Sequence, residues 1–523
     1  MAAGCRKPRV VFSYVSIDDE NDLLLEPYLR GLFVNGESCK VLRECAATLA
    51  VVHPSLVQAD HYTGPWGIPL LGSLAFLGGD FYSKECVDWT KKYGPVFRIK
   101  LGVKSIVLVN DFELIKEALC RTECLSRPRS WIFKNVGGIA SLNSKPWQEN
   151  RRFCNKMLRE LTHGKKSMLG HIEEEFQYLR DKVAEARGQP IVLRRTLLHS
   201  VSNNIATLLL GSRYQLNDPK QKQLEKLLMT FEILFTKVPQ VEPLPKFLGF
   251  ISRFAFDLAG GICGGQFVKQ LFEFFGHEVD RRLETTEANV KRHFIDGYLA
   301  MIKKHATTPD LKFSTHALRG HVIDLLLAGS SSVAITMLCI LLHCADNPST
   351  IQARIQREID DVVGCDRSPT WEDHLLMPYT MAVIWEMTRW KTLNRLNLPR
   401  EAEEDFILNG FLIPKGTIVI ANLWAAHMDP KYWKNPEKFD PSRFLTQDGS
   451  ALLPKPECLI PFSAGKRMCP GEFVATAQIF LCITTLLQEF RVESGDGSSF
   501  CVASNNFPVL LSKGLCFQSR ISE

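Results

Sequence analysis

The feature that most constrains this chain is a short loop near its C-terminus that leads directly into an apolar helix. Residues 462–471 read Phe-Ser-Ala-Gly-Lys-Arg-Met-Cys-Pro-Gly, and an apolar run typical of a helix follows over residues 473–490. Cys469 stands just before this helix, whose N-terminus favours a thiolate over a thiol, as does the preceding Arg467. Because the thiolate is the metal-binding form of cysteine, the loop predicts a metal ligand held against a buried helix.

The other positions of the loop indicate which group the cysteine holds. Gly465 and Gly471 let the backbone approach a flat, bulky ligand where a side chain would clash. With Phe462, Arg467 and Cys469 they match the haem-binding loop of the cytochromes P450, so the chain resembles this family of haem-thiolate monooxygenases. The resemblance implies haem b as cofactor, Cys469 as its metal ligand, and the other four residues as cofactor-binding.

The resemblance is continuous from residue 64 to near the end of the chain. It implies that residues 64–523 form a cytochrome P450 domain. The implied fold is mainly α with a small β portion, a single large domain around a buried haem. No Gly/Ser linker, repeat or low-complexity tract divides this region, and 45% apolar residues can fill one large core.

Residues 1–63 form an atypical N-terminal segment without a clear membrane anchor. Its longest apolar stretch, residues 46–58, is too short to span a bilayer, and four acidic residues between positions 18 and 22 argue against a targeting signal. Residues 64–69, Gly-Pro-Trp-Gly-Ile-Pro, resemble the proline-rich hinge of microsomal family members, in which an anchor helix precedes the hinge. We expect either a protein without the anchor or a faulty gene model, and favour the second. The resemblance implies that the protein is located at the endoplasmic reticulum membrane, on its cytoplasmic face.

Charge and cysteine usage exclude several other classes of protein. The net charge of +6 is too weak and too evenly spread to predict nucleic-acid binding. The 16 cysteines are irregularly spaced, which favours reduced thiols over a disulfide framework, and no CxxC pair indicates zinc.

Local patterns predict a mostly helical chain with short strands. Residues 96–101 and 105–109 indicate a hairpin, and residues 147–161 a helix with basic residues on one side. Helical patterns then dominate to residue 392. Residues 406–419 read as two short strands around Asn409-Gly410, with Pro414-Lys415-Gly416 as a second turn. Residues 325–345 carry no formal charge over 21 positions, which is long enough for a membrane span. Three successive serines weaken that interpretation, and the resemblance implies the central helix over the haem.

Charged residues on two further segments have defined partners in the family. Glu386 and Arg389 lie three apart on one helical face among apolar neighbours, where a buried charge must be paired. With Arg443 they resemble the family's structural Glu-Arg-Arg triad. Trp147 and Arg151 lie four apart and match the family's pair at a haem propionate.

Two more arginines are candidates for the propionates. Arg400, which follows Pro399, lies where the family often places a propionate partner, as does Arg467 in the loop. Arg127 is a weaker candidate, with a solvated surface group as the alternative. The predicted cofactor-binding residues outside the loop are therefore Trp147, Arg151 and Arg400.

The central helix departs from the family pattern at the oxygen-activating positions. Where monooxygenases usually carry Ala/Gly-Gly-x-Asp/Glu-Thr, this chain reads Ala328-Gly329-Ser330-Ser331-Ser332. We take Ala328, Gly329, Ser331 and Ser332 as the candidate catalytic residues. Ser332 can replace the threonine hydroxyl, whereas Ser331 cannot replace a carboxyl group as a proton relay. This predicts poor coupling or an already reduced oxygen substrate, unless another acid or a water chain takes over.

The resemblance also implies partners and three alternative functions. A helix with Arg151, Arg152, Lys156 and Arg159, followed by Lys165 and Lys166, together with Lys466 predicts a docking face for an NADPH-dependent flavoprotein reductase. Residues 238–258 predict an apolar flap that touches a membrane surface. The first hypothesis is a monooxygenase of small or medium apolar substrates, such as a fatty acid, steroid or xenobiotic. The alternatives are a reductase-independent isomerase or dehydratase of lipid peroxides, and a haem-binding protein without turnover.

Overall fold

The computed structural model describes most of the chain from Gly64 onward. The described residues are 64–65, 67, 72–73, 84–101, 104–128, 136–163, 168–215, 218–237, 264–285, 293–307, 313–495, 497 and 512–520. The predicted N-terminal segment, residues 1–63, and the predicted flap, residues 238–258, lie outside this part of the chain, as do Lys165 and Lys166. The predictions for those segments stay predictions.

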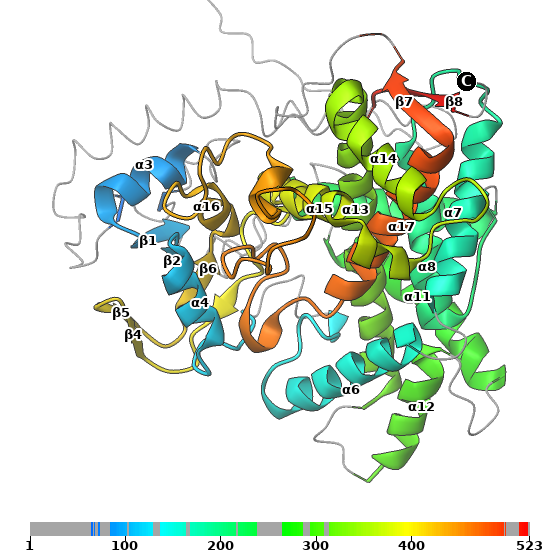
Figure 1. The fold of residues 1–523 in the computed structure, drawn as a ribbon. Coiled ribbons are helices and arrows are strands. Elements are labelled where there is room, and N and C mark those ends of the chain that lie inside the picture. The colour runs from blue at the N-terminus through cyan, green and yellow to red at the C-terminus, as the bar shows by residue number, and fades with distance from the viewer. Residues whose placement is uncertain are drawn as a thin grey trace, which may run out of the picture.

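The longest helix, α13 (Thr315–Asp346), runs through the centre of the helical part of the molecule (Figure 1). The Ser314 hydroxyl caps it by accepting a hydrogen bond from the Ala317 N–H at 3.1 Å. Apolar residues are spread around the helix and do not form one stripe, which is typical of a core helix. It is long and apolar enough to cross a membrane, but most of its apolar stretch is buried inside the protein. The structure therefore makes α13 a core helix.

Further helices surround α13. Three of them, α7 (Met168–Ala184), α8 (Arg194–Leu210) and α17 (Glu472–Glu489), pack with it into one bundle. The prediction of an apolar helix over residues 473–490 is confirmed by α17, and the basic helix predicted over residues 147–161 lies within α6. The other helices are α3 (Lys84–Tyr93), α4 (Phe112–Cys120), α6 (Ser144–His163), α9 (Pro219–Lys237), α11 (Gly264–Thr285), α12 (Phe294–Lys304), α14 (Ala353–Val362), α15 (Pro378–Lys391) and α16 (Leu423–Met428).

The described part of the chain also contains four short 3-10 or π-type helices. They are Pro348–Gln352, Trp371–Leu376, Pro441–Phe444 and Gly465–Arg467. The last of these belongs to the cysteine loop.

A four-stranded sheet lies on the opposite side of the molecule, beside α3 (Figure 1). Its order is β1 (Val96–Leu101), β2 (Lys104–Val109), β6 (Ile418–Ala421) and β3 (Arg400–Glu401), and only the β2–β6 pair is parallel. Alternate residues face opposite sides, as strand geometry requires. Residues such as Phe97, Ile106 and Leu108 pack under α3, whereas Val107, Val109 and Val419 join the main core. Both faces are therefore buried, and β3 places Arg400 at the inner side of the sheet.

The predicted hairpins are present. β1 and β2 pair antiparallel, and β4 (Phe406–Leu408) pairs with β5 (Phe411–Ile413) across a turn in which Asn409 and Gly410 both have positive φ. The second predicted turn, at residues 414–416, ends this hairpin. Residues 418–419 follow it in β6, which pairs with β2 and β3 of the larger sheet and not with β4 or β5. A last hairpin joins β7 (Phe490–Ser494) and β8 (Leu515–Ser519).

The predicted Glu386–Arg389–Arg443 cluster anchors α15 in the core. Arg389 makes two hydrogen bonds to the Glu386 carboxylate, at 2.7 and 2.8 Å, and Arg443 Nε lies 3.2 Å from Glu386 Oε1. Arg389 also donates to the carbonyl oxygens of His427 and Pro436. Each charge of the Glu386–Arg389 pair is thus buried and fully engaged by protein.

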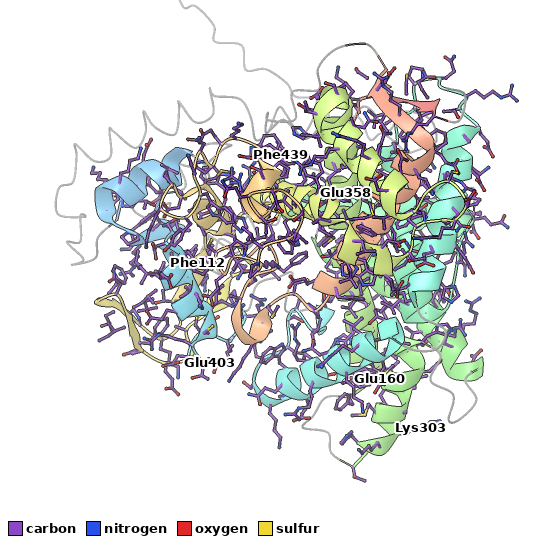
Figure 2. All side chains as sticks on the ribbon, in the orientation of Figure 1. Phe112, Glu160, Lys303, Glu358, Glu403 and Phe439 are labelled. Carbon is purple, nitrogen blue, oxygen red and sulfur yellow. The ribbon has the colours of Figure 1, made fainter. Side chains whose placement is uncertain are left out.

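A second acid fixes the start of the same helix. Glu358 of α14, labelled where α14 meets α15 in Figure 2, accepts the backbone N–H groups of Tyr379 and Thr380 at 2.7 and 2.8 Å. A carboxylate at a helix N-terminus satisfies exposed N–H donors and opposes the helix dipole. Both ends of α15 are therefore locked, which fixes the frame next to the cysteine loop.

Candidate functional site

The cysteine loop is a tight turn closed by its own backbone. The Cys469 N–H donates to the Phe462 carbonyl oxygen at 2.8 Å, and the Met468 N–H donates to that of Gly465 at 3.0 Å. Gly471 follows at the cap position of α17. The loop therefore presents the Cys469 side chain beside the start of α17, as the sequence predicts.

The two loop glycines differ in how tightly the surrounding protein constrains them. Gly465 has φ of 71°, and a Cβ there would overlap the carbonyl oxygen of Leu119 at the end of α4. A Cβ at Gly471 would meet only Cys469 Sγ, at an ordinary 3.9 Å. Gly465 is therefore needed for packing against α4, and the prediction that both glycines admit a flat ligand stays a prediction.

The Cys469 thiol lies in a mixed electrostatic environment. Burial of the loop raises its pKa, whereas the Gly471 N–H and the Arg151 guanidinium lower it. The prediction that Arg467 supplies the stabilising charge is wrong. The Arg467 guanidinium instead lies 4.0 Å from the centre of the Trp147 ring, and the nearby charge belongs to Arg151 of α6.

Three guanidinium groups gather next to this loop, two buried and that of Arg151 half-buried, and none of the carboxylates that the structure describes is hydrogen-bonded to them. Arg400 is 1% exposed, and none of its three guanidinium nitrogens has a hydrogen-bond partner. Arg151 Nε and Arg467 Nη1 are also buried and unpartnered. Burial first, then the neighbouring arginines, lowers the pKa of Arg467 to about 8. Burial likewise lowers the pKa of Arg400 to about 10, with Arg151 adding to the effect.

These orphaned donors test whether the site fits a dianionic cofactor. Buried positive charge that meets no anion carries a large desolvation cost. Guanidinium groups bind carboxylates through paired, charge-assisted hydrogen bonds. A group that brings two carboxylates, as haem does with its propionates, would satisfy Arg151, Arg400 and Arg467, so the residues present fit haem.

The remaining bonds of the arginines hold the cluster in place. Arg467 donates to the carbonyl oxygens of Leu125 and Leu142 at 2.8 and 2.7 Å, and Arg151 donates to that of Met468. Arg127 differs, because it donates to the carbonyl oxygens of Ala140, Leu398 and Pro399. This gives Arg127 a structural position and removes the surface alternative.

The predicted catalytic residues of α13 divide between two faces. Ala328 and Ser332 lie four apart on an exposed face, and the Ser332 hydroxyl donates to the Ala328 carbonyl oxygen at 2.7 Å. Gly329 faces α8, where a Cβ would come within 3.2 Å of the Ile205 side chain. Ser331 is buried, and its hydroxyl has no partner. The structure therefore brings together only Ala328 and Ser332.

Comparison with known proteins decides the family. The sequence profile described as "Cytochrome P450" matches residues 63–514. Human cytochrome P450 2J2 is 35% identical over 469 residues, which cover 85% of this chain and 92% of the relative. The chain belongs to the cytochrome P450 family.

Other relatives include the silkworm (Bombyx mori) farnesoate epoxidase, 31% identical over 82% of this chain and 87% of its own length. Rat cytochrome P450 2B2 is 32% identical over the same two shares. The predicted family and the mainly helical fold with a small β portion are confirmed. This cytochrome P450 is an oxidoreductase of the monooxygenase type, and its family implies a haem with a cysteine thiolate ligand.

One residue of the P450 site escaped the sequence analysis. Asp324 of α13 lies four residues before Ala328, and its carboxylate accepts the Ala140 N–H at 2.8 Å. A Cβ at Gly138 would overlap the Gly320 carbonyl oxygen, so the segment after residue 136 lies directly on α13. Burial raises the Asp324 pKa to about 7. The signal in the sequence was a lone acid directly before the charge-free run of residues 325–345.

The predicted basic face of the P450 is partly neutralised on α6. Arg152 pairs with Glu149 at 2.7 Å, and Lys156 lies 3.6 Å from Glu160. Lys466 in the cysteine loop is exposed. Exposed ion pairs of this kind are weak and leave the basic groups able to exchange partners.

Proposed function

We propose that this cytochrome P450 inserts one oxygen atom of O2 into a small or medium apolar substrate, such as a fatty acid, steroid or xenobiotic. Cys469 would be the iron ligand. The observation that carries this assignment is the set of buried, unpartnered donors of Arg151, Arg400 and Arg467 beside the Cys469 loop. No carboxylate among the described residues is hydrogen-bonded to these groups, and a haem with two propionates would supply the missing acceptors.

Each residue of the site has a part in this function. Cys469 would hold the haem iron as a thiolate, and the haem would supply oxygen activation when bound. The Gly471 N–H and Arg151 favour the Cys469 thiolate against its burial. The Trp147 ring packs against the Arg467 guanidinium, and the Phe462 carbonyl oxygen accepts the hydrogen bond from the Cys469 N–H that closes the turn.

On the opposite side, Ala328 and Ser332 would face the oxygen. The Ser332 hydroxyl keeps its orientation through the Ala328 carbonyl, which leaves the hydroxyl oxygen able to accept a proton-donating water. Gly329 keeps α13 close to α8 at this level.

The assignment is tested by the carbon monoxide difference spectrum of the reduced full-length protein. Wild type should show a strongly red-shifted Soret band, and Cys469→Ser should lose it. Cys365→Ser, at an exposed cysteine outside the site, should keep the band and serves as the control. If both variants keep the band, or if both lose it, the experiment does not support Cys469 as the iron ligand and the assignment is rejected.

The electron supply in this proposal is NADPH through a flavoprotein reductase. The exposed basic groups of α6 and Lys466 beside the cysteine loop support docking of an acidic partner. Docking through these groups predicts a turnover rate that falls with ionic strength. Attachment to the endoplasmic reticulum membrane on its cytoplasmic face is part of the same proposal. The name of the relative farnesoate epoxidase supports oxygen insertion into an apolar chain.

A second function is favoured by Ser331. A buried hydroxyl without a partner stands where the family usually has an acid, which supports an isomerase or dehydratase of lipid peroxides that needs no reductase. The test is turnover of a fatty-acid hydroperoxide without NADPH. Fast conversion to rearranged products would favour this second function, and dependence on NADPH and reductase would favour the first.

A further inference from the structure

A second group of buried polar atoms without partners belongs to residues other than the haem candidates. These atoms lie in α8, the loop after α8, and α9, and three side chains contribute them. They are His199 Nδ1, Tyr214 Oη and Gln221 Oε1. Buried polar groups normally have partners, so a local concentration of exceptions calls for a ligand or ordered solvent.

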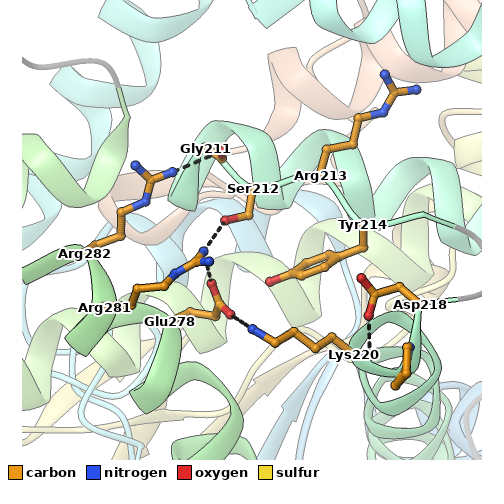
Figure 3. Close-up of a pocket in the computed structure, with 10 residues that line it drawn as sticks. Gly211, Ser212, Arg213, Tyr214, Asp218, Lys220, Glu278, Arg281 and Arg282 are labelled. Carbon is orange, nitrogen blue, oxygen red and sulfur yellow. Dashed lines mark hydrogen bonds and ion pairs between the residues drawn. The ribbon is translucent and has the colours of Figure 1, made fainter. Parts of the chain in front are cut away.

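A hollow of about 670 Å3 opens beside this group, between the end of α8, the start of α9 and α11 (Figure 3). None of its lining residues is a candidate haem residue. The lining residues are Gly211, Ser212, Arg213, Tyr214, Asp218, Pro219, Lys220, Glu278, Arg281 and Arg282.

The lining carries an excess of positive charge. The lining includes four basic side chains and two carboxylates, a net charge of +2, or +1 when Glu175, the partner of Arg213, is included. Glu278 is shared, because Lys220 donates to one of its oxygens at 2.5 Å and Arg281 to the other at 2.7 Å. One buried carboxylate therefore serves two cations, which leaves the hollow attractive to an anion.

Tyr214 supplies an unused donor at the floor. The residue is only 7% exposed, and its hydroxyl has no hydrogen-bond partner. Figure 3 shows this hydroxyl turned toward the side where Glu278, Arg281 and Lys220 meet. Burial raises the Tyr214 pKa, so the phenol keeps its proton and can donate.

The start of α9 adds a third contribution. Pro219 and Lys220 open this 19-residue helix at the rim of the hollow, and the N-terminal end of a helix favours negative charge. Its Lys220 N–H is held by the Asp218 carboxylate at 2.8 Å, which fixes this rim. Positive charge, a helix N-terminus and an unused phenol thus converge on one place.

We propose that this hollow binds an oxyanion of the phosphate class. A tetrahedral phosphate accepts hydrogen bonds from several directions, which suits a phenol, an ammonium and guanidinium groups arranged around it. The phosphate can belong to a soluble phosphate or phosphomonoester, or to a phospholipid headgroup. The site is separate from the haem and does not depend on the oxidative function.

The test is calorimetric titration of the haem-loaded full-length protein with inorganic phosphate and with glycerol 3-phosphate at constant ionic strength. We expect saturable binding of one equivalent by wild type. Tyr214→Phe and Lys220→Gln should each weaken it at least tenfold. Lys226→Gln, at an exposed lysine of α9 outside the hollow, should bind as wild type does.

Folding of the key variant is checked in the same experiment. Because the Tyr214 hydroxyl has no protein partner, Tyr214→Phe should keep the melting temperature of wild type in phosphate-free buffer. In phosphate, only wild type and Lys226→Gln should gain thermal stability. Equal binding by wild type and Tyr214→Phe would overturn the proposal.

Vesicle sedimentation distinguishes the two sources of phosphate. Wild type and Tyr214→Phe would be compared on vesicles of phosphatidylcholine with and without phosphatidic acid. Binding that requires phosphatidic acid and falls in Tyr214→Phe would identify a lipid headgroup. Saturable binding of soluble phosphate, without such a difference on vesicles, would identify a soluble ligand. If the protein binds in neither experiment, the proposed site is refuted.

Discussion

Two sets of buried arginines lie in this P450, and they differ in what compensates their charge. Arg389 is 0% exposed and bonds to a buried carboxylate and two carbonyl oxygens. Arg400 is equally deep, yet its guanidinium has no partner among the described residues. The difference teaches that a buried charge satisfied by protein belongs to the frame, whereas one left unsatisfied marks a binding site.

The largest expected effect is on the satisfied set. Glu386→Gln leaves Arg389 buried against a neutral amide, and breaking a buried pair costs about 3–5 kcal/mol. Urea unfolding should show this loss of stability, and the red-shifted carbon monoxide band should fall with it. As the control, Glu117→Gln removes an exposed 2.6 Å pair with Arg121 and should cost under about 1 kcal/mol. Equal losses in the two variants would break the comparison.

Substitution of an arginine without a partner should have opposite effects in the two forms of the protein: it should stabilise the haem-free form and weaken haem retention in the haem-loaded form. Arg400→Met removes an unpaired buried charge, so we expect the haem-free protein to gain about 1–3 kcal/mol of unfolding free energy. The haem-loaded protein should lose haem at least tenfold faster to a haem scavenger, because a propionate partner is gone. Arg389→Met is the matched variant and should destabilise both forms. If Arg400→Met destabilises the haem-free protein, the guanidinium has a partner within the protein.

Sequence spacing predicted the parts of the site that are local. Glu386 and Arg389 lie three apart on one helix, and Ala328 and Ser332 four apart, so helical geometry alone places each pair on one face. The Cys469 loop, α17 and the β1–β2 hairpin follow from short patterns in the same way.

What the sequence missed depends on contacts between distant segments. Gly465 is needed because α4, nearly 350 residues earlier, places the Leu119 carbonyl against it. Asp324 meets the Ala140 N–H across 184 residues. The lack of partners around Arg400 is likewise a property of everything packed against it, which no single-chain pattern encodes.

A third prediction extends the comparison to a carboxyl group, through Asp324. Its pKa is raised by burial from 3.8 to about 7, so the folded protein binds a proton that the unfolded chain releases between about pH 4 and 7. Stability should therefore fall as pH rises through this window. Solvent reaches part of the side chain, so we expect a fall of about 1–2 kcal/mol between pH 5 and pH 7.5.

Asp324→Asn should remove this pH dependence while it keeps an acceptor for the Ala140 N–H. The measurement is urea unfolding of both proteins at the two pH values. Because other groups titrate as well, the informative quantity is the difference between wild type and variant. If the difference in unfolding free energy between wild type and Asp324→Asn is the same at pH 5 and pH 7.5, Asp324 is ionised at both pH values. Its carboxylate would then be stabilised by protein partners, as that of Glu386 is.

The smallest effect on stability is expected at Ser331, which has an unsatisfied hydroxyl instead of an unsatisfied charge. Ser331→Ala removes a buried group without a partner and should change unfolding free energy by less than about 1 kcal/mol. Ser330→Ala is the matched variant on the next residue of α13, where the hydroxyl does have a partner, the Leu326 carbonyl oxygen at 2.7 Å. Ser330→Ala should lower the unfolding free energy by about 1 kcal/mol. We therefore expect Ser330→Ala to be less stable than Ser331→Ala, and the reverse order would contradict the comparison.

The same position also tests function, because a carboxyl group restores the family's usual acid. Ser331→Asp should raise the product formed per NADPH oxidised and lower the hydrogen peroxide released, since a carboxyl group can relay protons that a hydroxyl of very high pKa cannot. Product, NADPH and peroxide would be measured together at constant haem content, with Ser331→Asn as the isosteric control. If Ser331→Asp and Ser331→Asn behave alike, the missing acid does not limit oxygen activation. Another group on the same helix then supplies the protons, such as the Asp324 carboxyl group, whose pKa is about 7.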